Sequence, residues 1–103
     1  MKKRETLQMS RLDSRIGGAK QLFRQKVLAI VRRIPKGGCM TYTQVATQAG
    51  NSKAARGVGA IMRSNYDPTV PCHRVVRSDG SLGNYNRGGQ RVKKMLLTRE
   101  GAL

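Results

Sequence analysis

Hydrophobic residues first recur at a regular spacing between Lys20 and Ile34. Apolar side chains stand there at positions i, i+4, i+7, i+8 and i+11, namely Phe23, Val27, Ile30, Val31 and Ile34. This spacing places them on one face of an α-helix. Pro35 and the Gly37-Gly38 pair predict its end.

Two shorter helices are predicted next. Thr41 as N-cap and Gln44 three residues later form the pattern of a capping box, and Gly50 should end that helix. Asn51 and Ser52 offer an N-cap for a third helix from about Lys53 to Arg63. Two short helices joined by a tight turn indicate a helix-turn-helix motif.

Glycines interrupt the third predicted helix. Ala54, Ala55, Val58, Ile61 and Met62 fall on its inward face, whereas Gly57 and Gly59 stand among the remaining positions. A glycine inside a helix costs about 1 kcal/mol relative to alanine. Either the helix backbone approaches a partner closely, as in a narrow groove, or the helix packs tightly against another helix.

Residues 69–76 contain β-branched side chains around Pro71 and predict an extended segment. A turn is expected at 78–81, a glycine-rich loop at 83–89, and a last helix from Gln90 to Glu100 that stops at Gly101. We therefore predict a mainly α fold, a winged-helix-like helix-turn-helix domain with short extended segments around the loop at Cys72. Residues 20–103 form this domain, and residues 1–19 are expected to be a basic, flexible tail.

Charge narrows the range of partners. Lys and Arg total 21 against 5 acidic residues, a formal net charge of +16. Such an excess predicts a nucleic acid partner, because Lys and Arg gain affinity by releasing counterions from phosphates. A protein that only coats phosphate, such as a ribosomal or nucleoid protein, has the same signature. No apolar run approaches the roughly 20 residues that span a bilayer, so we expect no membrane association and a cytoplasmic, nucleoid-associated protein.

The two cysteines, Cys39 and Cys72, form no CxxC pair, and His73 is the one histidine of the sequence. Three such residues cannot complete a four-ligand structural zinc site, so we expect no metal. A disulfide is disfavoured in a cytoplasmic chain. Cys39 is interpreted as a small filler at a helix exit.

Cys72 directly precedes His73 and Arg74, a setting that suits an activated thiol. On an extended strand adjacent side chains point to opposite faces, so His73 would need a kink or a bridging water to reach Cys72. A buried cysteine beside a hydrogen-bonded histidine is the alternative.

Glu100 shares a helical stripe with Val92 and Leu96, and a carboxylate on such a stripe needs a partner. We expect His73 to be that partner, in a Glu100–His73–Cys72 relay, since a carboxylate orients the imidazole. The other interpretation is a helix-end glutamate that turns to water.

The chain resembles the O6-alkylguanine-DNA alkyltransferases. Residues 71–75, PCHRV, match the family's cysteine motif, and the segments TYTQVA, AARGVG, MRSN, GNY and LLTREG follow in the family's order from Phe23 to Gly101. The resemblance covers the family's C-terminal domain, and we expect no counterpart of its N-terminal domain. It implies a monomer that binds duplex DNA containing O6-alkylguanine, flips the base and accepts the alkyl group once, without a cofactor.

The resemblance also implies the role of each site residue. Cys72 would be the nucleophile, His73 its base and Glu100 the orienting carboxylate. Tyr42 would rotate the nucleotide and hydrogen-bond the guanine, and Asn65 would lie at the hinge between recognition helix and nucleophile. DNA would be bound by Arg56, which replaces the flipped base, and by Ala54, Ala55, Gly59 and Arg63. The alkyl pocket would be lined by Met62, Val75, Tyr85 and Asn86.

Two departures border that pocket. The stretch from Asn65 to Cys72 is about one residue shorter than is usual in the family, and the loop at 86–89 is about one residue longer. Alkyltransferase-like proteins, which bind alkylated guanine without repairing it and mark damage for other factors, also lack the N-terminal domain. Their cysteine is typically replaced, whereas Cys72 is retained here. A working transferase is therefore our first interpretation and a damage sensor the alternative.

Overall fold

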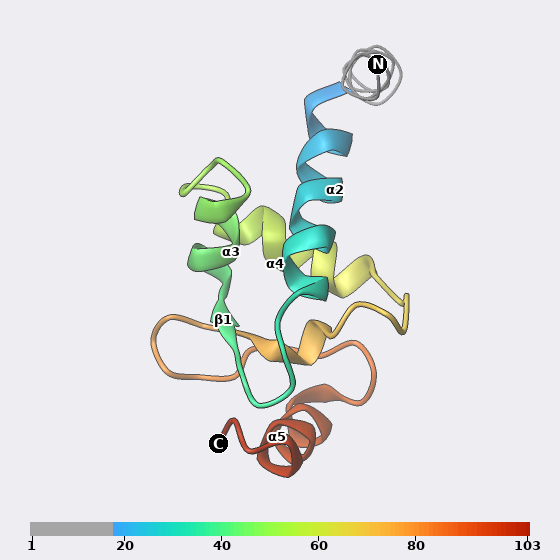
Figure 1. Cartoon of the computed structure of the whole chain (residues 1–103), viewed down its shortest axis with the longest axis vertical. Helices are drawn as coiled ribbons and strands as arrows, with labels where there is room; N and C mark the ends of the chain where they lie inside the picture. Colours follow the sequence, from blue (N-terminus) through green and yellow to red (C-terminus); the bar gives the residue numbers. More distant parts are fainter. Residues whose placement is uncertain (1–17) are drawn as a thin grey trace.

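The computed structural model describes residues 18–103. The predicted tail, residues 1–19, lies outside this range except for positions 18 and 19, which already belong to the first helix. The elements in chain order are α2 (Gly18–Arg32), β1 (Met40–Thr41), α3 (Tyr42–Gln48), α4 (Ala55–Ser64), a 3-10 turn η1 (Cys72–Arg74), β2 (Val75–Val76) and α5 (Gly89–Glu100). The described chain is mainly helical, as predicted (Figure 1).

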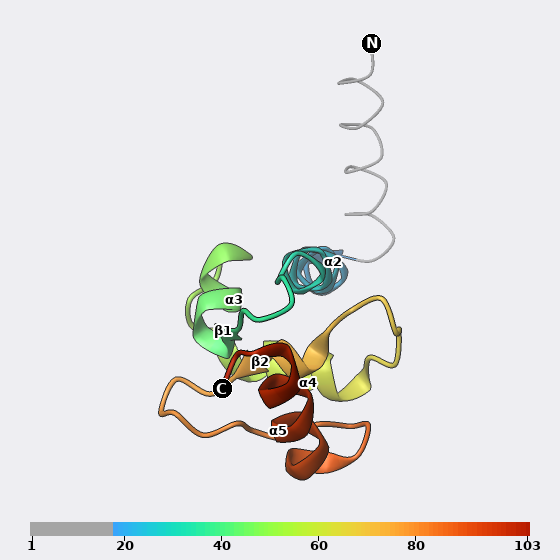
Figure 2. The same cartoon turned by 60° about the horizontal axis from the view of Figure 1, so that its bottom comes forward.

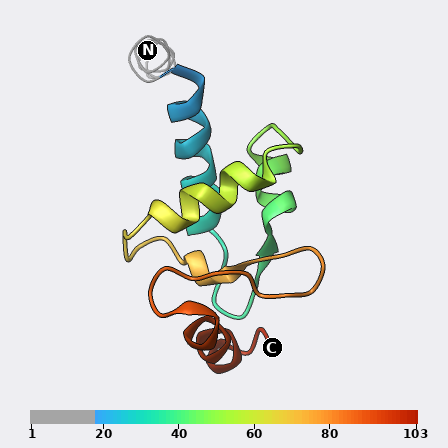
Figure 3. The same cartoon turned by 180° about the vertical axis from the view of Figure 1, so that it is seen from behind.

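Helices α2, α3 and α4 pack against one another on one side of the molecule, and α4 crosses α2 (Figure 3). On the other side α5 packs against η1 (Figures 1 and 2). Between them β1 and β2 form a parallel pair with Met40 opposite Val75 and Thr41 opposite Val76. The sequence analysis did not predict β1.

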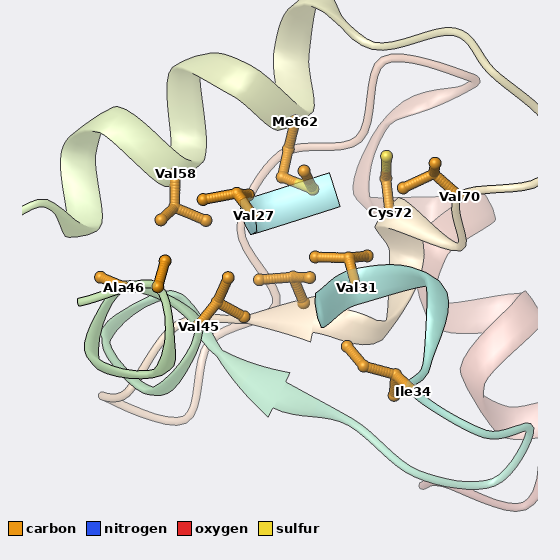
Figure 4. Close-up of a cluster of buried hydrophobic side chains, with 11 residues drawn as sticks. Val27, Val31, Ile34, Val45, Ala46, Val58, Met62, Val70 and Cys72 are labelled. Atoms are coloured by element: carbon orange, nitrogen blue, oxygen red, sulfur yellow. The ribbon is translucent and has the colours of Figure 1, made fainter. Parts of the chain in front are cut away.

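An aliphatic core lies beneath α4. Val27 and Val31 of α2 meet Val45 of α3 and Val58 and Met62 of α4 (Figure 4). Cys72 stands at the edge of this cluster beside Val70 (Figure 4). The nucleophile proposed from the sequence is therefore held against packed side chains rather than on a free loop.

The start of α3 is as predicted. The Thr41 hydroxyl accepts from the Gln44 N–H at 3.0 Å, and the Gln44 side chain accepts from the Thr41 N–H at 2.8 Å. These two bonds satisfy amides that the first helical turn leaves unpaired. They also fix the direction in which Tyr42, the first residue of α3, leaves the sheet.

The predicted start of the third helix is wrong. Helix α4 begins at Ala55, with Ala54 at its N-cap and no side-chain capping bond. The Asn51 side chain accepts from the Lys53 N–H at 3.1 Å, and the Asn51 carbonyl accepts from the Ala54 N–H at 3.0 Å. Asn51 thus closes the turn before the helix, because a short amide competes for local backbone donors.

The extended segment predicted for 69–76 is also wrong over most of its length. The Cys72 N–H donates to the Val70 carbonyl at 2.8 Å and the Arg74 N–H to the Pro71 carbonyl at 3.0 Å, so the chain turns through η1. The alternation expected for a strand therefore does not govern Cys72 and His73. The strand is limited to Val75 and Val76, where pairing with β1 becomes available.

The C-terminal predictions are confirmed. Helix α5 ends at Glu100, and Gly101 caps it in the left-handed conformation at φ 86°. The turn at 78–81 is closed by the Arg77 N–H, which donates to the Ser81 carbonyl at 3.0 Å.

Of the helices in residues 18–103, none combines the length and the apolar character that crossing a membrane requires.

Candidate active site and DNA interface

A cavity of about 470 Å³ opens beside α4 and reaches Cys72. Its walls come from α3, α4, η1 and the loop of residues 77–88 that joins β2 to α5. The lining residues are Tyr42, Thr43, Ala55, Arg56, Gly59, Met62, Arg63, Cys72, Arg77, Ser78, Asp79, Asn84, Tyr85 and Asn86. The volume lies in the range of small-molecule sites, so the cavity can receive an extrahelical base.

Cys72 is 7% exposed and reduced, and its sulfur is contacted by Asn65. The Asn65 Nδ2 donates to Cys72 Sγ at 3.3 Å. The Asn65 amide thus lies directly against the sulfur that would act as the nucleophile. Cys39 is also reduced but exposed, so it does not fill space in the core as the interpretation of a small filler at a helix exit requires.

Glu100 is joined to both His73 and Arg74. Its Oε2 accepts from His73 Nε2 at 2.9 Å, and its two oxygens accept from Arg74 Nε and Nη2 at 2.9 and 3.0 Å. Arg74 Nη1 donates to the Ile34 carbonyl at 2.8 Å, which fixes the guanidinium. The interpretation of Glu100 as a solvated helix-end residue is thereby excluded.

Hydrogen bonds from Arg74, and then from His73, lower the pKa of Glu100 to about 2. Glu100 is therefore a carboxylate that only accepts hydrogen bonds, so His73 Nε2 carries the proton. In the neutral ring this leaves Nδ1 as the basic nitrogen. Within residues 18–103 no direct hydrogen bond links His73 to Cys72, so only the Glu100–His73 half of the predicted relay is formed.

Tyr42 lies against a buried lysine that the sequence analysis missed. Lys93 is 0% exposed, and its Nζ donates to the Tyr42 hydroxyl at 3.4 Å and to the Asn84 carbonyl at 3.3 Å. Burial lowers the pKa of Lys93 to about 8, and burial raises the pKa of Tyr42. Tyr42 is thus a protonated phenol, a hydrogen-bond donor, at neutral pH.

The cavity rim is strongly cationic. Arg56, Arg63 and Arg77 line it, against the single acidic residue Asp79. Three guanidinium groups around one opening suit the phosphates beside an extrahelical nucleotide.

Gly83 lies in the loop beside Tyr42 and Arg77. A Cβ added to Gly83 would meet the Tyr42 hydroxyl at 3.2 Å and Arg77 Cγ at 3.5 Å. Gly83 has φ +79° as well, so both its backbone and its surroundings favour glycine.

The two glycines of α4 are not required by helix packing. A Cβ at Gly57 would make an ordinary contact of 3.7 Å with Phe23 of α2, and one at Gly59 would meet only the end of Arg63 at 3.9 Å. Gly59 lines the cavity instead. Of the two explanations from the sequence, the geometry favours close approach of a partner at Gly59.

Residues 22–102 match the family model described as "6-O-methylguanine DNA methyltransferase, DNA binding domain". The chain belongs to this family. It is similar to the methylated-DNA–protein-cysteine methyltransferase of Rattus norvegicus, with 52% identity over 76% of this chain and 38% of the relative. It is also similar to that of Salmonella typhimurium, with 43% identity over 89% of this chain and 53% of the relative. The chain therefore spans about half or less of the length of these relatives.

Two solved structures extend the family comparison. Mycobacterium tuberculosis OGT in complex with DNA superposes with a TM-score of 0.71 and 39% identity, over 76% of this chain and 48% of that one. S. pombe Atl1, in complex with damaged DNA containing O6-carboxymethylguanine, gives a TM-score of 0.68 and 34% identity, over 77% of this chain and 75% of that one. The fold is thus that of the family's DNA-binding domain.

Most site residues inferred from the family resemblance lie together. Those that line one cavity are Tyr42, Ala55, Arg56, Gly59, Met62, Arg63, Cys72, Tyr85 and Asn86. Asn65, His73 and Glu100 stand behind this wall, and His73 packs edge-on against Tyr85 with ring centroids 6.1 Å apart. Ala54 and Val75 contribute to the core and do not line the cavity.

The sequence analysis missed Lys93, Arg77 and the bond from Arg74 to Glu100. Lys93 could have been found from its spacing, because Lys93, Leu97 and Glu100 follow the i, i+4, i+7 pattern of a buried helix face. No such signal marks Arg77. Across residues 18–103 no three His, Cys, Asp or Glu side chains come together as a metal site.

Proposed function

We propose that the protein repairs DNA by transferring an alkyl group from O6-alkylguanine in duplex DNA to Cys72. The observation that carries this proposal is the contact of Cys72 Sγ with Asn65 in the wall of a cationic cavity, directly before the His73–Glu100 pair. A target atom inside a duplex is out of reach of a buried thiol, so the nucleotide must first be flipped into the cavity.

The chemistry follows from the residues around the sulfur. The thiol proton passes to His73 Nδ1 through a bridging water, since the two side chains share no direct hydrogen bond, and the Glu100 carboxylate stabilises the imidazolium. As the sulfur–carbon bond forms, the bond from the alkyl carbon to O6 breaks and its electron pair stays on guanine. The Tyr42 hydroxyl donates a hydrogen bond toward this developing charge.

Recognition of the duplex is assigned to α4. Arg56 fills the space left by the flipped base, and Ala55 and Gly59 let the helix backbone approach the minor groove. Arg63 and Arg77 bind the neighbouring phosphates. The product is a thioether, and no described group is placed to cleave it, so each molecule reacts once.

The test is the intact mass of the protein after mixing with a duplex that holds one O6-methylguanine. We expect a stoichiometric gain of one methyl group on the wild type and none on Cys72→Ala, which should still bind the lesion. A methyl gain on Cys72→Ala would overturn the assignment of the nucleophile.

A damage sensor is the second candidate. It is favoured by the similarity to S. pombe Atl1, whose structure holds damaged DNA, at 34% identity. The same experiment separates the two functions. A wild type that binds the lesion selectively but gains no methyl group would belong to the sensor class despite its cysteine.

A further inference from the structure

Asn86 joins the loop before α5 to the C-terminal end of α4. Its Nδ2 donates to the carbonyls of Met62 at 3.1 Å, Arg63 at 2.8 Å and Asn65 at 2.8 Å. One amide group has two hydrogens, so three carbonyls share them. Carbonyls at the end of a helix lack partners within the helix, and Asn86 donates to two of those in α4 and to that of the C-cap residue Asn65.

The orientation of the Asn86 side chain is set by these bonds. Its Oδ1 is buried and accepts no hydrogen bond from the part of the chain that the structure describes. A buried acceptor without a donor destabilises the arrangement that contains it. The three carbonyls therefore hold the amide in place even though its other end is left unpaired.

Asn65 connects this contact to the nucleophile. It is 5% exposed and accepts from Asn86 with its backbone while its side chain donates to Cys72 Sγ at 3.3 Å. A shift of the Asn65 backbone would move the amide that faces the sulfur. Both loops that depart in length from the family pattern, 65–72 and 86–89, meet at this point.

We propose that Asn86 is a positioning residue, which holds Asn65 so that its side chain stays directed at the sulfur of Cys72. The inference rests on the proposed function, because it takes Cys72 as the reacting group. It adds that loop 86–89 sets the reactivity of the thiol as well as the shape of the pocket.

The experiment measures alkylation of Cys72 by iodoacetamide without DNA, so that it does not depend on alkyl transfer. All variants carry Cys39→Ser, which removes the exposed cysteine, so that Cys72 is the one thiol that reacts with iodoacetamide. We expect Asn86→Ala to slow alkylation about fivefold, the effect of one weakened hydrogen bond. Gln90→Ala, an exposed amide at the start of α5, is the matched control and should leave the rate unchanged.

A double variant decides whether Asn86 acts through Asn65. Asn65→Ala should slow alkylation, and Asn65→Ala with Asn86→Ala should be no slower than Asn65→Ala alone, because residues in one chain of contacts are not additive. The proposal would be overturned if the double variant were slowed by the product of the two single-variant effects. It would also be overturned if Asn86→Ala were alkylated as fast as the Gln90→Ala control.

Loss of folding is detected separately by circular dichroism. If Asn86→Ala does not fold, Asn86→Ser decides, since its hydroxyl can still donate one hydrogen bond and an intermediate rate is expected. An unchanged Asn86→Ser rate would then refute the proposal. If wild-type Cys72 reacts rapidly with iodoacetamide but the protein gains no methyl group from DNA, the proposed function is refuted and the role of Asn86 still stands.

Discussion

Arg74 binds Glu100 through two hydrogen bonds, from Nε at 2.9 Å and from Nη2 at 3.0 Å. The two residues belong to η1 and to the end of α5, so this pair joins the cysteine turn to the last helix. Because the same carboxylate accepts from His73, Arg74 holds Glu100 ionised and in position for the imidazole.

Replacement of Glu100 by glutamine should slow methyl transfer about 100-fold, the usual scale of general acid–base assistance. The glutamine amide cannot supply the negative charge that stabilises a protonated His73. Single-turnover transfer measured at pH 7 tests this, with Arg99→Gln, an exposed neighbour on α5, as control. Transfer by Glu100→Gln at the rate of the control would remove Glu100 from the mechanism.

The same variant should reveal the contribution of Glu100 to acid stability. The pKa of Glu100 is lowered from 4.5 to about 2, so its stabilisation is complete above pH 4.5 and is lost as the pH falls toward 2. We expect wild type to unfold at a higher temperature than Glu100→Gln at pH 7, and the gap to narrow through this range. A gap that is constant from pH 7 to pH 2 would contradict the ionised pair.

Lys93→Met should stabilise the fold at pH 7. Burial lowers the pKa of Lys93 from 10.5 to about 8, so below pH 8 the folded state carries a cost of roughly 3 kcal/mol. This cost falls as the pH rises from 8 to 10.5, because the folded state releases its proton first. Urea unfolding at pH 7 and pH 10 should show a gain for Lys93→Met that shrinks at the higher pH, whereas the exposed Lys94→Met should show neither effect.

Arg56→Ala should weaken binding to a duplex with O6-methylguanine about tenfold and slow transfer. The side chain is exposed at the cavity, where we assign it the space of the flipped base. Stacking contacts of this kind contribute about 1–3 kcal/mol per base. Fluorescence anisotropy against Arg99→Ala, which removes the same charge from α5, provides the comparison. Equal lesion affinity in the two variants would count against the role of Arg56.

Binding to duplex DNA should weaken steeply with salt. If only Arg63 and Arg77 contact phosphates, the slope of log affinity against log salt is about −1.8, and further basic residues make it steeper. Titrations between 50 and 200 mM salt test this. A flat response would mean that the charge of the chain serves another partner.

The elements that the sequence predicted well depend on local rules. The capping box at Thr41, the stop at Gly101 and the apolar face of α2 require only residues within one or two turns of a helix. The Glu100–His73 pair was also predicted, because a carboxylate on an apolar stripe demands a partner and His73 was the candidate available.

The misses arise where tertiary contacts decide. β-Branched residues flank positions 72–74 within the segment 69–76, yet Cys72 and Arg74 bond back to Val70 and Pro71 and form a 3-10 turn. Lys93 can be buried because two groups accept its hydrogen bonds. These are the hydroxyl of Tyr42, which is distant in the sequence, and the carbonyl of Asn84 in the loop before α5. Neither outcome has a local signal beyond the spacing of Lys93 from Leu97.

The two-residue sheet links Tyr42 to Cys72 across 30 positions of sequence. Thr41 pairs with Val76 immediately before Tyr42, and Met40 pairs with Val75 immediately after the turn that holds Cys72. The separation of phenol and thiol therefore depends on this register, not on the lengths of the loops at 65–71 and 77–88. Loops around the cavity can then change in length while the backbone positions of Tyr42 and Cys72 are kept, so protein engineering could reshape the cavity without changing the spacing of phenol and thiol.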